Sequence, residues 1–309
     1  MRESELLKHI YGRSAKLLSQ FSQVLVGPGH DCAVVASGSP VLLKIDQLVA
    51  GRHYRDGTPL DLVARKAIAR AVSDIAASGG TPLAALAGAT LPDAYPNANE
   101  LFDAMARWAE HFGCPLVGGD IATSSAPGSP LVLSVSIIGS PHASRGPVLR
   151  SGAQPGDGVF VTGAVGGSFD PTTGLGPHLT FEPRLVEAKF LCDTLGPRLR
   201  AMMDVSDGLG RDAGRLASMS GVAIELKESA LPLRTPGLPW RAAVGDGEDY
   251  ELLFAAAGEV PPRCPATGTP LTRIGTVKAG SGASIVLRDG TRVDVSALGW
   301  DHGMGAQTA

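Results

Sequence analysis

Short apolar runs of strand length alternate with longer stretches of helical periodicity in the first half of the chain. Two stretches with helical spacing, both ending in glycine, are residues 61–80 and 99–113. The expected strands are 41–50 (VLLKIDQLVA), 83–91 (LAALAGATL), PLVGGD and LVLSVSIIG. The pattern therefore predicts an α/β unit in which strands and helices alternate.

A segment rich in Ser, Gly and Pro, residues 140–158, is the best candidate for a domain boundary. Beyond it, VFVTGAVGGS opens a second unit. The expected helices there are FEPRLVEAKFLCDTL and SDGLGRDAGRLASMSG, and the expected strands are DYELLFAAAG, TRIGTV and SIVLRDG. We predict two α/β domains of similar size, residues 1–140 and 141–309.

Composition narrows the class of protein. The 309 residues are 44% hydrophobic, enough for one large or two ordinary cores. A net charge of -3 makes nucleic acid a poor candidate partner. The four cysteines lie far apart without a CxxC, and no apolar run suits a membrane span. The first 21 residues have the pattern of a charged amphipathic helix without a signal-peptide core, so we expect a cytoplasmic protein.

The candidate chemistry lies in acidic residues set among small ones, because the usual signatures GxxxxGK[ST], GxGxxG, GxSxG and HExxH are missing. These acidic residues are Asp31, Asp46, Asp74, Asp120, Asp204, Asp207, Asp246, Glu248, Asp249 and Glu251. Carboxylates in glycine-rich turns suit Mg²⁺, which prefers oxygen ligands. Basic residues are scarce beside these motifs, so metal ions are expected to neutralise a bound polyphosphate.

Several of these carboxylates also have a purely structural interpretation. Asp31 and Asp120 can be turn residues, and Asp207 can cap the helix that follows it. Asp46 lies in an apolar strand pattern, where Lys44 can be a plain salt-bridge partner. Spacing alone thus indicates magnesium-dependent phosphate chemistry without excluding these alternatives.

Asp74 carries the strongest functional signal. It lies one turn before Gly79 and Gly80, near a helix C-terminus, where the helix dipole disfavours an anion. Arg70, four residues earlier, can neutralise it. Without that ion pair, the position requires a bound cation.

Eight motifs, in order, resemble the thiamine-monophosphate kinase family of the aminoimidazole-ribonucleotide synthetase-like ATP-binding superfamily. They are GPGHDCAVV, IDQLVAGRHY, ARKAIARAVSDIAASGGTPLAAL, LVGGD, LRSGAQPGDGVFVTG, HLTFEPRL, DVSDGLGRDAGRLASMSGV and GEDYELLF, with LGWDH near the end. The resemblance implies an N-terminal domain whose mixed sheet forms a barrel in a homodimer, a C-terminal α/β domain, and a cleft between them. It implies ATP-dependent phosphorylation of thiamine monophosphate to thiamine diphosphate.

The resemblance also assigns roles to residues. It places the magnesium carboxylates at Asp31, Asp46, Asp74, Asp120, Asp204 and Asp207. It places ATP contacts at Gly119, Asp120, Arg150 and Ser206, and thiamine-phosphate contacts at His53, Glu248 and Trp300. Arg150 can grip a phosphate and Trp300 can face a thiazolium cation. Transfer is expected in line, through charge neutralisation and positioning by residues such as Asp46 and Asp207, with no covalent enzyme intermediate.

Structural alternatives stand for three of these assignments. Arg150 can simply tie down the linker, Trp300 can be a hydrophobic plug for the C-terminal segment, and His53 can be a surface histidine.

The chain departs from the family pattern at three places. His30 precedes Asp31 where a second aspartate is usual, Lys44-Ile45-Asp46 replaces Ser/Thr-Thr-Asp, and IATSSAPG follows Asp120. These changes remove oxygen ligands, so we expect fewer metal ions, with Lys44 contributing to the ATP site as a point charge on a phosphate. Two alternatives remain: a related ATP-dependent phosphotransferase or synthetase for another small metabolite, and a non-catalytic ATP-binding protein.

Overall fold

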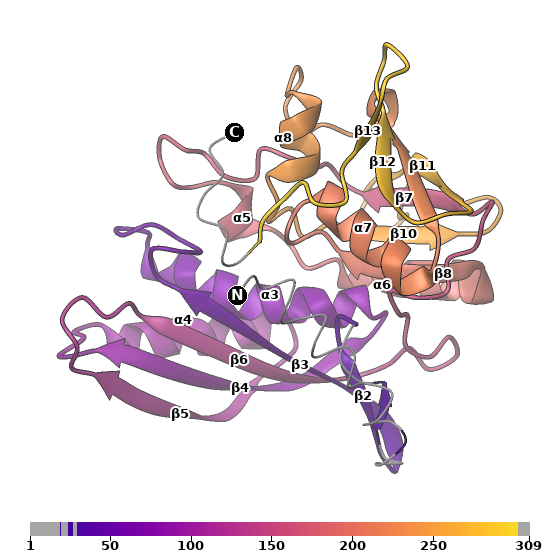
Figure 1. Cartoon of the computed structure of the whole chain (residues 1–309). Helices are drawn as coiled ribbons and strands as arrows, with labels where there is room; N and C mark the ends of the chain where they lie inside the picture. The colour runs from indigo at the N-terminus through magenta and orange to yellow at the C-terminus, as the bar shows by residue number, and fades with distance from the viewer. Residues whose placement is uncertain (1–18, 20–23, 27–29, 302–309) are drawn as a thin grey trace.

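The computed structural model describes residues 19, 24–26 and 30–301 (Figure 1). The predicted N-terminal helix, residues 1–21, lies outside these residues except for residue 19. The first sheet has the strand order β1-β2-β3-β6-β4-β5, antiparallel except between β4 and β5. Its strands are β1 (Val24–Val26), β2 (Ala33–Ser37), β3 (Ser39–Val49), β4 (Thr81–Pro92), β5 (Leu116–Ser124) and β6 (Val132–Ser140).

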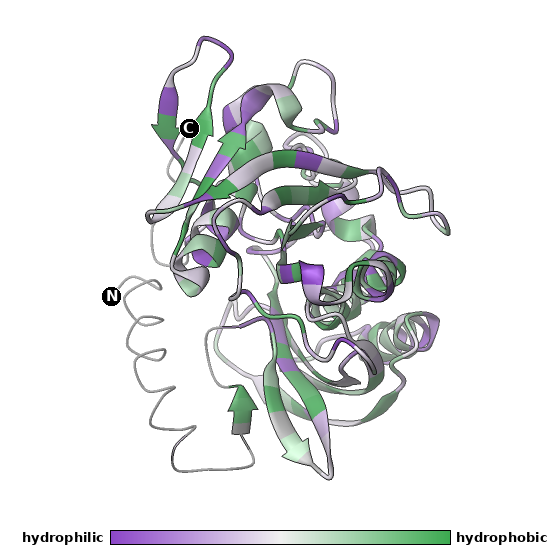
Figure 2. Ribbon diagram, turned by 90° about the vertical axis from the view of Figure 1, so that its right-hand side faces the viewer, coloured by the Kyte–Doolittle hydropathy of each residue, from purple (hydrophilic) through white to green (hydrophobic). Residues whose placement is uncertain are grey.

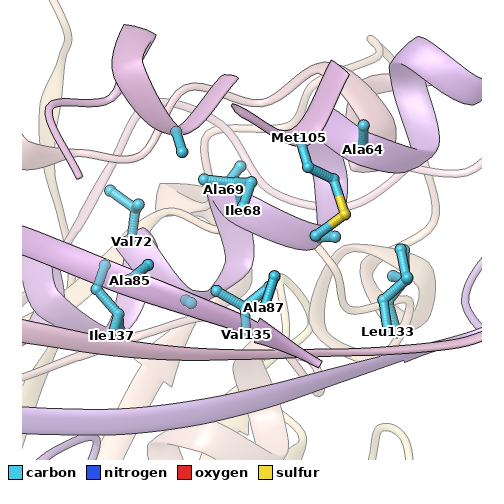
Figure 3. Packing of buried hydrophobic residues seen from close by; sticks show 14 of the residues in the cluster. Ala64, Ile68, Ala69, Val72, Ala85, Ala87, Met105, Leu133, Val135 and Ile137 are labelled. Carbon is cyan, nitrogen blue, oxygen red and sulfur yellow. The ribbon is translucent and has the colours of Figure 1, made fainter. Parts of the chain in front are cut away.

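Two helices, α3 (Leu60–Ala77) and α4 (Ala98–His111), cover one face of this sheet (Figure 1). Side chains of α3 and α4 pack on alternate residues of β4 and β6, as the close-up shows (Figure 3). Helix α3 is buried along nearly its whole length because it also contacts the second half of the protein. Alanines on α3 permit this close approach on several sides.

Glycine at the end of α3 is required by packing. Gly79 has a φ of +68°, and a Cβ added there would lie 2.7 Å from the Sγ atom of Cys192. At Gly80 the added Cβ would lie 2.3 Å from Cδ1 of Leu42. The Gly-Gly stop therefore both ends the helix and lets the two halves of the molecule meet.

The second sheet has the order β13-β12-β9-β11-β7-β10-β8, with only β9 and β12 parallel. Its strands are β7 (Gly158–Thr162), β8 (Leu199–Asp204), β9 (Ala223–Lys227), β10 (Leu252–Ala256), β11 (Leu271–Lys278), β12 (Gly282–Val286) and β13 (Arg292–Asp294). The helices are α5 (Pro177–Thr180), α6 (Leu185–Leu195), α7 (Leu209–Ser220) and α8 (Trp240–Gly245), with short 3₁₀ turns at η1 (Gly196–Arg198) and η2 (Glu228–Ala230). Hydrophobic segments, broken by polar positions, lie on strands of both sheets (Figure 2).

Two apolar layers enclose the second sheet. Helix α7 packs on one face, and α6 with the end of α3 packs on the other. Phe181 and Tyr250, from the second half of the chain, join the core of the first half, where their rings stack with centroids 3.8 Å apart. The two halves therefore share part of their cores.

The predicted α/β class is confirmed, in the form of two mixed sheets. Within the described residues, the helices and strands expected from the pattern are found, whereas the strands β1, β2, β8, β9 and β13 had not been predicted. The first sheet is open rather than a closed barrel over the residues that the structure describes. Its last strand ends at Ser140 and the second sheet begins at Gly158, on either side of the predicted boundary segment.

The face of the first sheet opposite the helices is apolar and exposed. We call it the open sheet face; it carries Leu43, Ile45, Leu86, Val117 and Ile138, which border a groove of about 550 Å³. Ile45 is 60% exposed and Val117 is 67% exposed. Exposed apolar patches of this kind mark interaction surfaces. Among the residues that the structure describes, no helix is long and apolar enough to cross a membrane.

Candidate active site

A cleft of about 530 Å³ lies between the two halves of the molecule. Residues of β3, of the loop after it and of α3 line one side, and residues around the start of α7 and the turn before β10 line the other. The lining includes Lys44, Asp46, His53, Asp74, Arg150, Asp204, Ser206, Asp207, Glu248 and Trp300 from the predicted site. Residues far apart in the sequence thus meet in one place, as the predicted roles require.

Three buried carboxylates, Asp31, Asp74 and Asp204, form the centre of the site. Each offers an oxygen atom within 4.8 Å of those of the other two. Burial raises the pKa of Asp204 to about 7, and the charge of Asp31 adds to this effect. Burial also raises the pKa of Asp74 well above its usual value, against the lowering effect of Lys44. Crowded carboxylates that offer only oxygen atoms fit a hard divalent cation such as Mg²⁺.

Lys44, and not Arg70, is the ion-pair partner of Asp74. The Nζ atom of Lys44 lies 2.9 Å from Oδ1 of Asp74 and 3.9 Å from Oδ1 of Asp46. Arg70 instead donates to the carbonyl of Gln47 at 2.6 Å and lies 3.7 Å from Asp46. The expectation that Arg70 neutralises Asp74 is therefore wrong as a direct contact, because the guanidinium is directed toward β3.

Asp31 is held by Arg150 in a two-bond fork. Nε of Arg150 donates to Oδ2 of Asp31 at 2.6 Å, and Nη2 donates to Oδ1 at 2.9 Å. Burial favours the neutral acid, but the charge and hydrogen bonds of Arg150 prevail and lower the pKa of Asp31. The fork joins the start of β2 to the segment before β7. The side chain of Arg150 therefore does tie the linker down, and it does so at the edge of the carboxylate centre.

Asp207 does not cap α7. Its carboxylate pairs with Arg215 of α7, and α7 has Gly208 at its N-cap without a side-chain cap. Asp212 of α7 holds the turn before the helix, since its Oδ2 accepts the backbone N–H groups of Ser206 and Asp207, each at 3.0 Å. The capping interpretation of Asp207 is wrong because the chain turns before the helix begins. Asp207 and Ser206 are left facing the cleft.

The other end of the cleft contains His53 and Glu248, which a buried lysine connects. Nζ of Lys66 lies 2.6 Å from Oε1 of Glu248 and donates to the carbonyl of His53 at 2.6 Å. Burial lowers the pKa of Lys66 to about 8, although the charge of Glu248 opposes that shift. Glu248 and Tyr250 both have left-handed backbone conformations, with φ of +53° and +52°. Strain of this kind concentrates at functional sites.

The rim of the cleft near Glu248 is aromatic and basic. The guanidinium of Arg52 lies 4.4 Å from the centre of the Trp300 ring, and the backbone N–H of Trp300 donates to the carbonyl of Asp207 at 2.8 Å. Trp300 is 37% exposed, so it is no buried plug. Its ring already lies against the guanidinium of Arg52 at the cleft. His53 accepts the backbone N–H of Val49 at 2.8 Å and is only partly exposed, so it is no free surface histidine.

Gly119 and Asp120 do not line the cleft. Asp120 lies in β5, the edge strand of the first sheet, where it pairs with Gly88 of β4. Its side chain is exposed. It therefore lies in a strand and is not the turn residue of the structural alternative. Strand β5 is separated from β3 by β6 and β4. A gap of three strand spacings is about 14 Å across the sheet.

Two further expectations are wrong. Basic side chains are not scarce at the site, because packing brings six of them to the cleft: Lys44, Arg52, Arg55, Arg70, Arg150 and Arg215. The loss of a hydroxyl at Ile45 does not remove a ligand from the carboxylate centre, because side chains alternate along β3 and that of Ile45 is directed away from the centre. Lys44 and Asp46 face the cleft, whereas Ile45 lies on the open sheet face.

Known proteins with similar sequences belong to one family of kinases. A family model described as "AIR synthase related protein, N-terminal domain" matches residues 29–140. Thiamine-monophosphate kinase of Rhodopirellula baltica is 35% identical over 303 residues, which cover 91% of this chain and 90% of that protein. The chain belongs to the thiamine-monophosphate kinase family. The Bacillus subtilis kinase is 30% identical, with 98% of this chain and 99% of that protein covered.

Solved structures agree with this membership. One titled "AaThiL complexed with AMPPCP and TMP" has a TM-score of 0.79 and 30% identity, and the alignment covers 97% of each chain. The thiamine monophosphate kinase structure from Aquifex aeolicus has a TM-score of 0.72 and 29% identity, covering 95% of this chain and 99% of that chain.

Sequence reasoning missed three residues that organise the site of this family member. Lys66 lies eight residues before Asp74 on α3, and Arg215 of α7 lies eight residues after Asp207, which precedes that helix. A spacing of about two turns puts Lys66 and Asp74 on the same side of α3, which was a usable signal. Tyr250, stacked on Phe181 at the cleft, had no such signal because its ring partner lies far away in the sequence.

Proposed function

We propose that this chain transfers the γ-phosphoryl group of ATP to the phosphate of thiamine monophosphate, giving thiamine diphosphate and ADP. The observation that carries the proposal is that one cleft connects the carboxylate centre to the Glu248–Trp300 end. Family membership supports it, because relatives of similar length are thiamine-monophosphate kinases.

The carboxylate centre is the proposed position of metal-bound ATP. Asp31, Asp74 and Asp204 would hold Mg²⁺, which supplies charge neutralisation on the phosphate oxygens when bound. Asp46 and Asp207 border this centre and position its cations, while Ser206 offers a hydroxyl to the phosphates. Arg150 and Lys44 add protein charges beside the same group. Transfer then depends on alignment and charge, and no side chain need form a covalent intermediate.

The Glu248–Trp300 end is the proposed position of thiamine monophosphate. The carboxylate of Glu248 and the ring face of Trp300 both favour a cation such as thiazolium. Lys66 holds Glu248 and the backbone of His53 in one fixed arrangement. The cation of the substrate would thereby be oriented so that its phosphate is directed toward the metal centre.

The test is direct. Purified protein incubated with Mg-ATP and thiamine monophosphate should yield stoichiometric thiamine diphosphate and ADP, resolved by chromatography. An Asp204→Asn variant is the matched control and should give no product. ADP release with other phosphorylated metabolites but not with thiamine monophosphate would assign another substrate. ATP binding without any turnover would make the chain a non-catalytic nucleotide binder.

We further propose a homodimer that pairs the open sheet faces of two copies. Its support is the exposed apolar surface of the first sheet, which includes Ile45, Leu86 and Val117. Gly119 and Asp120 lie on the same sheet but away from their own cleft, so their proposed contact with metal-ATP requires a second copy. Sedimentation analysis should give twice the chain mass for the natural protein and a monomer for Ile45→Glu. A monomeric natural protein would refute the dimer.

The predicted division into residues 1–140 and 141–309 and a cytoplasmic location are retained as parts of the proposal. The two separate sheets support the division. Four free cysteines, all buried, suit a reducing compartment.

A further inference from the structure

The ammonium group of Lys44 occupies a position among carboxylates from separate elements. Its Nζ atom lies 2.9 Å from Asp74 of α3 and 3.9 Å from Asp46 of its own strand. The charges of Asp204 and Asp31 also act on it. Its side chain is 23% exposed, so solvent reaches it only in part. A single cation thus bridges Asp46 and Asp74 at the edge of the carboxylate centre.

A metal ion and this ammonium would compete for the same space. Mg²⁺ binds oxygen atoms at about 2.0–2.1 Å in a strict octahedron, so a metal bridging Asp46 and Asp74 would displace the lysine nitrogen from between them. Both groups neutralise carboxylates, but only the lysine is covalently fixed and always present. Asp31 and Asp204 do not contact Lys44 directly: Asp31 is bound by Arg150, and Asp204 accepts from Ser73 at 2.7 Å.

We propose that the Lys44 ammonium takes the place of one divalent cation, so that this chain binds metal-ATP with fewer metal ions than its carboxylates alone would hold. Asp46 then serves as a counter-ion of Lys44 and not as a metal ligand. The oxygen atoms that remain for a metal ion are those of Asp31, those of Asp204 and the Asp74 oxygen that Lys44 does not contact. The inference rests on the proposed function only in assigning this centre to metal-ATP, and it does not depend on which molecule accepts the phosphoryl group.

Counting bound metal tests this directly. Mn²⁺ binding per chain is measured by equilibrium dialysis in the presence of ADP, without thiamine monophosphate. The series comprises the natural protein, Lys44→Met, which keeps the side-chain volume, and Lys44→Arg, which keeps the charge. Lys189→Met is the matched control, because Lys189 pairs with Asp193 at 2.6 Å on the exposed side of α6.

Lys44→Met is expected to bind one more Mn²⁺ per chain than the natural protein. Lys44→Arg and Lys189→Met should match the natural protein. An unchanged or lower count for Lys44→Met would overturn the proposal. The dialysis contains no phosphoryl acceptor, so its metal count does not depend on the kinase reaction. If the separate kinase assay gave no thiamine diphosphate, the proposed function would be refuted while this count stayed valid.

A second variant keeps the proposal falsifiable if Lys44→Met does not fold. Asp46→Asn is made in the natural background, with folding checked by circular dichroism. If Lys44 fills the position between Asp46 and Asp74, the Mn²⁺ count stays that of the natural protein. If Asp46 is a metal ligand, the count falls by one and the proposal is wrong.

Discussion

The fork between Arg150 and Asp31 makes the sharpest stability prediction. In Arg150→Met the Asp31 carboxylate, only 4% exposed, loses both charged hydrogen bonds beside two further carboxylates. Breaking one partner of a buried ion pair costs about 3–5 kcal/mol. We therefore expect the free energy of unfolding, from urea titration with a metal chelator at about pH 8, to fall by that amount.

The loss should depend on pH with a definite sign. In the natural protein the pKa of Asp31 is lowered, so the fork stabilises the fold above the unfolded pKa and fails only in acid. Without Arg150, burial raises the pKa of Asp31, so the folded variant binds a proton that the unfolded chain has released. The stability of the variant should then fall as pH rises, and its deficit should be smaller at about pH 5 than at about pH 8.

Two further chains complete the experiment. The double variant Arg150→Met/Asp31→Asn should recover part of the loss, because no unpaired charge remains. Lys189→Met, which breaks an exposed ion pair, should cost less than about 1 kcal/mol. A deficit for Arg150→Met of under about 1 kcal/mol, or one that does not change with pH, would refute this account of the fork.

Three other outcomes are expected. Asp204→Asn should weaken Mn²⁺ binding in dialysis, yet raise the metal-free stability above pH 7 by about 1 kcal/mol or more, since the pKa of Asp204 is raised to about 7. Gly119→Ala should cost about 1–3 kcal/mol in urea titration, because its Cβ would lie 1.9 Å from the carbonyl oxygen of Ala87, whereas Gly88→Ala, with its nearest contact at 3.7 Å, should cost less. Trp300→Ala should raise KM for thiamine monophosphate about 2- to 30-fold in steady-state assays with little change in kcat; an unchanged KM would remove the ring from the substrate site.

Local patterning predicted most elements because their signals are local. Helix α3 follows from periodic apolar positions and a glycine stop, and β4 from a run of strand-forming length. Strand β8 was missed because it is short, buried at nearly every position and followed at once by a turn. A strand of that kind has no alternation to detect.

Many residues that line the cleft were named from the sequence, but Gly119 and Asp120 lie outside it and the pairs were not predictable. Carboxylates in glycine-rich surroundings identified Asp74 and Asp204, whereas their partners depend on packing between distant segments. Lys44 lies 30 residues from Asp74, and Arg150 lies 119 residues from Asp31. No local pattern encodes such pairs. By contrast, the outward orientation of Ile45 follows from strand alternation and could have been predicted.

Helix α3 has a consequence for how this site can change over evolutionary time. Lys66, which holds the Glu248 end, and Asp74, at the carboxylate centre, are eight residues apart on this one buried helix. At 1.5 Å per residue the two ends of the cleft are set about 12 Å apart along its axis. The continuous helix therefore fixes the distance between the two ends of the cleft. Loops around the cleft can vary in length, but an insertion or deletion within α3 would rotate and shift both ends at once.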